Sequence, residues 1–372
     1  MATTLTIDNR ALVRIGSGLQ LQRTASPFQS GTGPVRRVLR VGVCGTDLQI
    51  QRGVRSDRAA ILGHEGIAVR LNSGSGARER CEIFNPVDPD DQDVILGHSH
   101  DGLLQDYLLH EIPSHRVVPA HGALPLDLGP LVEPTATALY AWELMRPRLH
   151  SGASVAIFGG GSAGLLLAML GEDLGYRIQV VHPRRERRRF LQQLDVLHAD
   201  AITDSVRTGS VTGAVVCVPR EAAFEAVGRA IDSLAADGVL DLFGGIPADL
   251  RHPGLPAADL SAVRRTNVCG HGVAPTNVDT NRGQRLWLTG HRGTSAIQLG
   301  HAQQHLLAAP ARYARVITQV VSLDEAAQRI PAMAQRDRSL GEYAKVVVDA
   351  TMAQRTRSVD LHTTVADQLG GA

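Results

Sequence analysis

The chain has 372 residues, of which 43% are hydrophobic, enough apolar material for two domains with cores of their own. Its 38 Lys and Arg residues balance 37 Asp and Glu residues, which argues against nucleic acid or a charged membrane as a general partner. The four cysteines are widely separated and no stretch approaches the roughly 20 apolar residues of a membrane span, so we expect a soluble, cytoplasmic protein without a disulfide scaffold.

Short apolar runs that glycines and prolines interrupt fill residues 1–135, such as VLRVGVC, GIAVRL, DVILG and LLQDYLL. This texture is typical of a mostly β region with long loops. Around Pro134 the pattern changes, because TATALYAWELM predicts a helix and short apolar strands then alternate with helical stretches. The alternation predicts a doubly wound parallel sheet. Residues 247–277 are expected to form an irregular excursion, and 351–372 a polar tail.

A glycine-rich turn follows the first strand of the alternating region. In SVAIFGGGSAGLL the motif GxGxxG consists of Gly159, Gly161 and Gly164, with Ser162 and Ala163 between the last two. The first glycine permits a tight turn, the second lets the backbone approach a pyrophosphate, and the third lets helix and strand pack closely. Because an apolar strand precedes the motif and an apolar helix follows it, we predict a dinucleotide site; the alternative is a turn without a cofactor.

The end of the next strand, RIQVV, predicts which dinucleotide is bound. Sites for NAD usually carry Asp or Glu there to hold the ribose 2′-hydroxyl, whereas this chain has His182. Arg184 and Arg185 follow directly, and guanidinium groups suit a 2′-phosphate, so we expect NADP(H). The alternative is that the arginines lie on a solvated helix face, which is the expectation for Arg188 and Arg189.

Residues that suit a catalytic zinc site stand at three places in the first half of the chain. The strand VGVC ends at Cys44, ILGHEGIAV contains His64 and Glu65, and LVEP contains Glu133. A thiolate, an imidazole and a carboxylate can bind zinc and leave one position open for water or substrate. Each residue also has an ordinary interpretation, as a small buried thiol, a hydrogen-bonded histidine or a carboxylate at a helix start.

The motifs GVCGTDLQI, GHEGIAV, HDGLLQDYLL, LVEP, VAIFGGGSAGLL and LFGGIP occur in this order. Through them the sequence resembles the zinc-containing medium-chain dehydrogenase/reductase superfamily over most of its length, and is most similar to the glucose dehydrogenase branch. The resemblance implies an α/β protein with a GroES-like, mostly β catalytic domain over 1–136 and 291–350. It also implies an NADP-binding Rossmann domain over 137–290, with 351–372 as a C-terminal tail.

The resemblance also implies roles for single residues. It makes Cys44 and His64 direct zinc ligands, and Glu65 and Glu133 ligands either directly or through water. It makes the hydroxyl of Thr46 the group that passes the substrate proton toward solvent.

Two departures from the family pattern have consequences. Where the family often holds a second, structural zinc with four cysteines, this chain has only Cys81, so we expect one catalytic zinc and no structural zinc. Where the proton relay often contains a histidine, this chain has Gln49, which cannot act as a base, so water or another residue has to complete the relay. Asp47 is expected to brace its turn rather than to touch substrate.

Together these features predict a zinc-dependent oxidoreductase that transfers a hydride between NADP(H) and a secondary alcohol or ketone of a sugar, cyclitol or polyol. Pro219, Gly244 and Gly290, in loops after the later strands, are expected to line the nicotinamide end of the cofactor. One alternative is an NADPH-dependent carbonyl reductase that acts on another hydroxylated metabolite. A different class is a zinc-free, non-catalytic NADPH-binding protein. We expect a homodimer or homotetramer with a small-molecule substrate.

Overall fold

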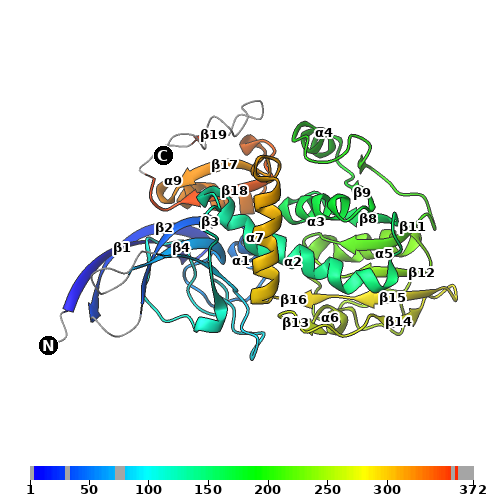
Figure 1. Ribbon diagram of the computed structural model, residues 1–372, viewed down its shortest axis with the longest axis horizontal. Coiled ribbons are helices and arrows are strands. Elements are labelled where there is room, and N and C mark those ends of the chain that lie inside the picture. Colours follow the sequence, from blue (N-terminus) through cyan, green and yellow to red (C-terminus); the bar gives the residue numbers. More distant parts are fainter. Residues whose placement is uncertain (1–3, 30–33, 72–79, 353–356, 359–372) are drawn as a thin grey trace. The chain divides into compact units, whose positions relative to one another are not determined.

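The computed structural model describes residues 4–29, 34–71, 80–352 and 357–358, and the chain divides into two compact units (Figure 1). The first unit takes residues 1–133 and 299–372, and the second takes residues 134–298. The helix α2 (Gly129–Met145) leads out of the first unit, and α7 (Ala296–Ala308) leads back into it. No helix in the described ranges combines the length and apolar character needed to cross a membrane.

The first unit is built on an eight-stranded sheet. Its strands run in the order β19-β17-β18-β3-β4-β5-β7, and β6 pairs with β3. The bounds are β3 (Val35–Gly42), β4 (Glu65–Leu71), β5 (Arg80–Phe84), β6 (Tyr107–Leu108), β7 (Val117–Pro119), β17 (Ile317–Ser322), β18 (Lys345–Asp349) and β19 (Arg357–Ser358). A long hairpin of β1 (Thr4–Ile15) and β2 (Gly18–Gln29) and the helices α1 (Gly45–Gln51), α8 (Pro310–Ala314) and α9 (Leu323–Ala334) complete it.

Apolar side chains from the hairpin, the sheet and the helices α1 and α9 form one core, so the mostly β region predicted for 1–135 folds together with the last strands of the chain. Val38 and Val41 of β3, Leu323 and Ile330 of α9 and Val348 of β18 are almost completely buried in it. Two expected strands differ from the prediction. DVILG makes only isolated bridges, and of LLQDYLL only β6 is a strand. Of the predicted polar tail, β19 pairs antiparallel with β17, and 359–372 lie outside the described residues.

The second unit is the predicted doubly wound α/β domain. Its seven-stranded sheet has the order β10-β9-β8-β11-β12-β15-β14, and every pair is parallel except that of the edge strand β14 with β15. The bounds are β8 (Ser154–Phe158), β9 (Arg177–Val181), β10 (Ile202–Thr203), β11 (Val211–Val216), β12 (Leu234–Asp241), β14 (Thr276–Asp279) and β15 (Arg285–Thr289). The expected parallel Rossmann-like sheet is confirmed.

Helices connect these strands, as the alternating pattern predicts. They are α3 (Ser162–Asp173), α4 (Arg185–Gln193), α5 (Ala223–Ser233) and α6 (Leu260–Arg264). The side chains of α5 that face the sheet, including Val227 and Ala230, are fully buried against β-strand residues such as Ala214 and Leu240. The irregular excursion over 247–277 contains α6 and the short strand β13 (Asn267–Val268), which pairs with β16 (His291–Arg292).

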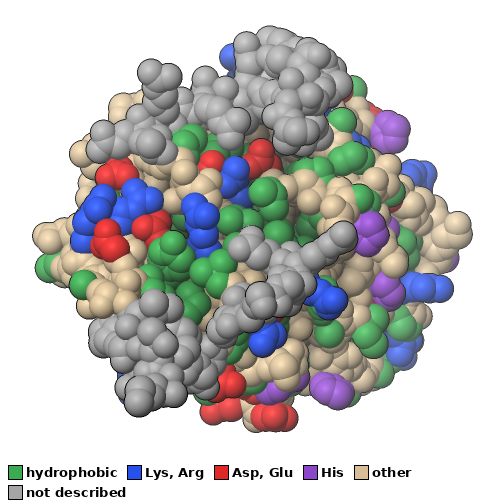
Figure 2. Space-filling model, turned by 60° about the vertical axis from the view of Figure 1, so that its left-hand side comes forward, with side chains coloured by type: hydrophobic (Ala, Val, Ile, Leu, Met, Phe, Trp, Pro, Cys, Tyr) green, Lys and Arg blue, Asp and Glu red, His purple; other side chains and the backbone are tan. Residues whose placement is uncertain are grey.

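Charged side chains of both signs lie beside one another on the face drawn in Figure 2. In the first unit, Arg10 binds Asp106 at 2.7 Å, and Arg55 binds Asp57 at 2.7 Å. Both pairs are half-buried, and each charge lies beside a charge of the opposite sign.

Three glycines let two loops of the first unit pack backbone to backbone. The segment that ends at Gly63 runs along the segment that begins at Gly102, and the N–H of Leu103 donates to the carbonyl of Gly63 at 2.9 Å. A Cβ atom at Gly102 would lie 2.1 Å from that same carbonyl oxygen and 2.7 Å from the Cα of Gly97. The close approach therefore fixes the chain immediately before His64.

We expect Gly102→Ala to destabilise the first unit by about 1–3 kcal/mol, because the backbone of Gly63 has to move to admit the new methyl group. Gly122→Ala is the matched control, since no described atom lies within 4 Å of a Cβ built there. Urea unfolding followed by circular dichroism measures both. Equal midpoints for the two variants would contradict the packing argument.

Candidate functional site

Cys44 caps the helix α1 directly after the strand β3 ends. Its Sγ accepts a hydrogen bond from the N–H of Thr46 at 3.4 Å, and its own N–H donates to Oδ2 of Asp47 at 2.9 Å. These reciprocal bonds form a capping box in which the thiol takes the place usually held by Ser or Thr. The arrangement explains why the strand ends on a cysteine: the turn fixes the direction of the sulfur.

Asp47 is completely buried and joins this turn to the segment around His64. Its Oδ1 accepts from the N–H of Gly63 at 3.2 Å and lies 3.5 Å from Nδ1 of His64. Burial by itself would raise the pKa of Asp47, but His64 and the donated backbone bonds lower it on balance. Burial opposes and Asp47 favours a charged imidazole, and the net result holds the pKa of His64 well above its usual value. The expected bracing role of Asp47 is thus observed.

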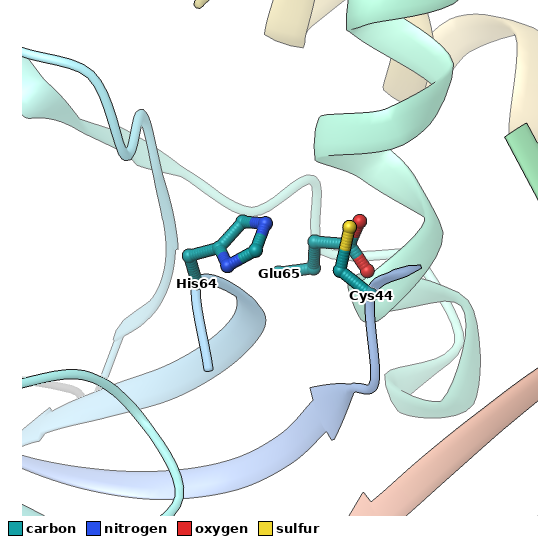
Figure 3. Close-up of side chains that lie close together, drawn as sticks. All are labelled: Cys44, His64 and Glu65. Carbon is teal, nitrogen blue, oxygen red and sulfur yellow. The ribbon is translucent and has the colours of Figure 1, made fainter. Parts of the chain in front are cut away.

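Donor atoms of Cys44, His64 and Glu65 gather within 4.8 Å of one another (Figure 3). The sulfur comes from the start of α1, the imidazole from the loop before β4 and the carboxylate from the first residue of β4. Sulfur, nitrogen and oxygen donors in one partly buried cluster fit zinc, and three protein ligands leave a fourth position for water or substrate. The residues present therefore fit the metal that the sequence predicts.

Glu65 has a second partner, Lys345, which the sequence did not single out. The ammonium group of Lys345, the first residue of β18, forms an ion pair with Oε2 of Glu65. The lysine side chain is only 1% exposed. Burial by itself would lower the pKa of Lys345, but Glu65 and Cys44 outweigh that effect and raise it.

Two further residues were predicted for this centre, Thr46 and Glu133, and neither belongs to the group of Cys44, His64 and Glu65. Thr46 is half-buried in α1 beside the cysteine. Glu133 is buried inside α2 but does not belong to any group of three potential metal-binding side chains among the described residues. A second, overlapping group consists of Asp47, His64 and His98, and the ring of His98 packs edge-on against that of His64 with centroids 4.7 Å apart. The sequence reading missed His98, for which GHSH was the only available signal.

The glycine motif in the second unit has the geometry that a phosphate-binding turn needs. Gly159 adopts φ +136°, and a Cβ there would lie 2.0 Å from the carbonyl oxygen of Cys217. A Cβ at Gly164 would lie 2.1 Å from the carbonyl oxygen of Gly159. Gly161 is the N-cap of α3, and a Cβ built there meets no described atom within 4 Å. Space is therefore open beside Gly161 at the N-terminus of the twelve-residue helix, which begins with Ser162 and Ala163, and helix N-termini favour anionic groups.

A buried arginine supports this turn, although the sequence reading did not identify it. Arg187 is 8% exposed and donates from Nε and Nη2 to the carbonyl oxygen of Gly160, at 2.9 and 2.6 Å. Its guanidinium group also lies 5.0 Å from the ring centroid of Phe190. The side chain thus holds the middle of the glycine turn in place from α4.

The other basic residues after β9 divide into two groups. Arg184 and Arg185 are exposed at the start of α4, and the N–H of Arg184 donates to Nδ1 of His182 at 3.3 Å. Arg188, expected on a solvated face, is instead half-buried: it donates to the carbonyl of His182 at 2.9 Å and pairs with Asp204 at 3.3 Å. The shape of the loop, and not only its charge, therefore depends on arginine.

Pro219 and Gly244 lie in loops at the carboxyl ends of neighbouring strands, β11 and β12, and Gly159 follows β8. The N–H of Gly244 donates to the carbonyl of Val216 at 2.7 Å, and a Cβ there would lie 2.6 Å from the carbonyl oxygen of Val218. All these loops stand at one edge of a parallel sheet, which is where such sheets bind ligands.

Buried polar groups gather below the same edge. Asp241, the last residue of β12, is fully buried, and neither carboxylate oxygen has a hydrogen-bond partner among the described residues. Burial raises the pKa of Asp241 to about 7, although the positive charge of Arg264 opposes this. Burial and the same arginine hold the pKa of His291 well below its usual value. Arg264 also donates to the carbonyl of Gly244 at 3.0 Å.

The sequence matches no family model. The curated 2-dehydro-3-deoxy-L-galactonate 5-dehydrogenase of Pseudoalteromonas atlantica is 29% identical over 177 residues, which are 42% of this chain and 51% of that protein. The chain thus matches about half the length of this curated relative.

Solved structures match nearly the whole chain. A protein of Sinorhizobium meliloti 1021 described as a zinc-binding dehydrogenase, bound to NADP, has a TM-score of 0.69 at 19% identity and covers 92% of this chain and 99% of its own. L-Idonate 5-dehydrogenase of Escherichia coli has a TM-score of 0.70 at 15% identity, and the match covers 93% of this chain and 99% of that protein. 2R,3R-Butanediol dehydrogenase of Bacillus subtilis has a TM-score of 0.64 at 16% identity, and the match covers 92% of this chain and 100% of that protein. The chain therefore shares the fold of these dehydrogenases, and the fold that the sequence resemblance implies is confirmed.

The raised pKa of Asp241 predicts how stability depends on pH. Because the folded state holds this proton more tightly than an ordinary carboxyl with a pKa of 3.8, its stabilising effect is complete below about pH 4 and is lost as pH rises to about 7. Each pKa unit corresponds to about 1.4 kcal/mol, so the ionised carboxylate costs the folded state a few kcal/mol at pH 8.

We therefore expect Asp241→Asn to raise the melting temperature at pH 8 by about 5 °C or more, with a gain that shrinks steadily as pH falls from 7 to 4. Differential scanning calorimetry across this range is the measurement. The exposed Asp249→Asn is the matched control and should change little at any pH. A gain that does not vary with pH would mean that Asp241 is not the responsible group.

Proposed function

Starting from the fold of the zinc-binding medium-chain dehydrogenases, we propose that this protein is a zinc-dependent oxidoreductase that uses NADP(H). It interconverts a secondary alcohol and a ketone of a sugar, cyclitol or polyol. The observation that carries the proposal is the convergence of Cys44, His64 and Glu65 within 4.8 Å, in a chain that also presents a glycine turn at a helix N-terminus. Glu133 is proposed as a further ligand, direct or through water.

Zinc bound at this centre would act as a Lewis acid that polarises a carbonyl or stabilises an alkoxide, so that a hydride can pass to or from the nicotinamide. The chain's own residues hold and orient the reacting groups. Cys44 supplies a thiolate whose direction is set by the helix cap, and His64 supplies a nitrogen while Asp47 faces its other nitrogen. A carboxylate behind a ligating histidine fixes the tautomer of the ring and raises its basicity.

Thr46 is proposed to exchange the proton of the substrate hydroxyl. The next relay group cannot be Gln49 acting as a base, because an amide does not take up a proton at neutral pH. Gln49 is nevertheless buried with an Oε1 that has no hydrogen-bond partner in the described part of the chain. That oxygen can accept from a water molecule, so we propose that the proton leaves through water held by Gln49.

The NADP(H) preference is proposed to come from Arg184 and Arg185, which are exposed at the end of β9 where no carboxylate repels a 2′-phosphate. The NADP bound to the similar Sinorhizobium protein supports this choice. For the substrate class, support comes from two similar proteins that are named as 5-dehydrogenases of sugar acids. Reduction of another hydroxylated carbonyl metabolite is the second candidate, and it uses the same site in the opposite direction.

A metal analysis tests the centre. We expect about one zinc per chain in the purified protein, and loss of it in Cys44→Ser and in His64→Ala. Cys81→Ser, a change of the same kind at a half-buried cysteine in β5, is the control and should keep the metal. Inductively coupled plasma mass spectrometry gives the content. Retention of zinc by Cys44→Ser, or two zinc ions per chain, would contradict a single centre at this place.

A cofactor titration tests the basic pair. We expect Arg184→Ala combined with Arg185→Ala to weaken NADPH binding at least tenfold and to leave NADH binding within about twofold, since only the former carries the 2′-phosphate. Arg189→Ala, a similarly exposed arginine of α4, should change neither. Isothermal titration calorimetry separates the two cofactors. NADPH binding without any zinc would favour a non-catalytic NADPH-binding protein, and activity screens on sugars, sugar acids, cyclitols and their ketones would then fail.

A further inference from the structure

A buried cation stands next to the residues proposed to bind zinc. Lys345 is 1% exposed, pairs with Glu65 and lies within electrostatic reach of Cys44 and Asp47. An ammonium group offers no lone pair to a metal, and its charge repels one. Burying a lysine–glutamate pair also costs desolvation energy, and apolar residues of similar size would often be more stable. The lysine therefore needs an explanation other than stability.

The fold makes specific room for this pair. Lys345 on β18 and Glu65 on β4 belong to strands that both pair with β3, so their side chains meet across it. The residue of β3 at this place is Gly42, and a Cβ there would lie 2.6 Å from Cε of Lys345 and 2.9 Å from Oε2 of Glu65. A side chain at position 42 would displace the lysine from the carboxylate.

The pairing divides the two oxygens of Glu65 between different tasks. Oε2 is bound to the ammonium group, and Oε1 has no hydrogen bond within the described residues. A carboxylate that has lost one oxygen to a lysine can bind a metal with one oxygen at most, and as a weaker donor. A free carboxylate at the same place can bind with both oxygens and fill the coordination shell.

We propose that Lys345 is a positioning residue of the metal centre, which keeps one oxygen of Glu65 away from the metal and so preserves an open coordination position for substrate. The proposal rests on the proposed function, because it needs a metal at Cys44 and His64. It assigns no proton transfer to Lys345. Gly42 belongs to the same device, since it leaves the space in which the pair forms.

Cobalt(II) is the probe, because its visible absorption reports the number and kind of ligands without any turnover. Metal-free protein is titrated with Co²⁺ against a competing chelator, for wild type, Lys345→Met, Glu65→Gln and the double variant. The neutral double variant removes both charges together and so avoids leaving either one unpaired in the interior. Circular dichroism melts of the metal-free proteins show which variants fold.

We expect Lys345→Met to bind Co²⁺ at least tenfold more tightly than wild type and to show weaker visible bands, because the freed second oxygen raises the coordination number. In the Glu65→Gln background, the same lysine change should leave the band intensity unaltered. This non-additivity is the signature of a lysine that acts through Glu65.

Unchanged or weaker Co²⁺ binding in Lys345→Met would overturn the proposal. Tighter Co²⁺ binding with unaltered visible bands would overturn it as well, since removal of a repelling charge alone would explain that result. If Lys345→Met does not fold, a difference in band intensity between Glu65→Gln and the double variant still overturns it, because the lysine would then act without Glu65. Failure of the proposed function looks different: wild-type protein would then show no thiolate-to-cobalt charge-transfer band, whatever the variants do.

Discussion

A buried carboxylate, that of Asp47, joins the pieces from which the candidate metal centre is made. It accepts hydrogen bonds from the backbone of Cys44 and Gly63 and faces Nδ1 of His64, so three groups from two segments converge on one side chain. A charge removed from water in this way is tolerated only when it is well partnered. The same bonds set the direction of the thiol and of the imidazole. The position of two donor atoms thus follows from satisfying a single buried charge.

Other buried charges in this chain are harder to explain by stability alone. Lys345 occupies the interior of one unit beside potential metal ligands, and Asp241 lies fully buried in the other with no hydrogen-bond partner in the described residues. Both lie beside residues of the proposed chemistry: Lys345 pairs with Glu65, a proposed zinc ligand, and Asp241 ends the strand that leads to the loop of Gly244. Strongly perturbed ionisable groups of this kind gather at functional sites, where local stability is given up for chemistry. Each unit thus buries an ionisable group beside residues of the proposed site, Lys345 in the first unit and Asp241 in the second.

Much of the architecture follows from local patterns that a sequence contains in full. The alternation of apolar strands and helical stretches after Pro134 predicts the parallel sheet, because each pattern depends on near neighbours. The glycine motif predicts its turn for the same reason: Gly159 and Gly164 have no room for a side chain. One wrong prediction also came from a local pattern. DVILG has the composition of a strand, but it lies in a loop of the first unit where only isolated bridges form.

The sequence by itself determined the kinds of donor atoms and the glycine turn, since Cys44, His64 and the glycines carry their chemistry and local geometry wherever they are placed. Only the tertiary structure decided which groups meet. Lys345 pairs with Glu65 across a strand, and Arg187 reaches back to Gly160. These partners are far apart in the chain, and no periodicity records the direction in which a side chain points once strands have paired. Contacts of that kind arise from strand order and register, which the whole fold has to establish first.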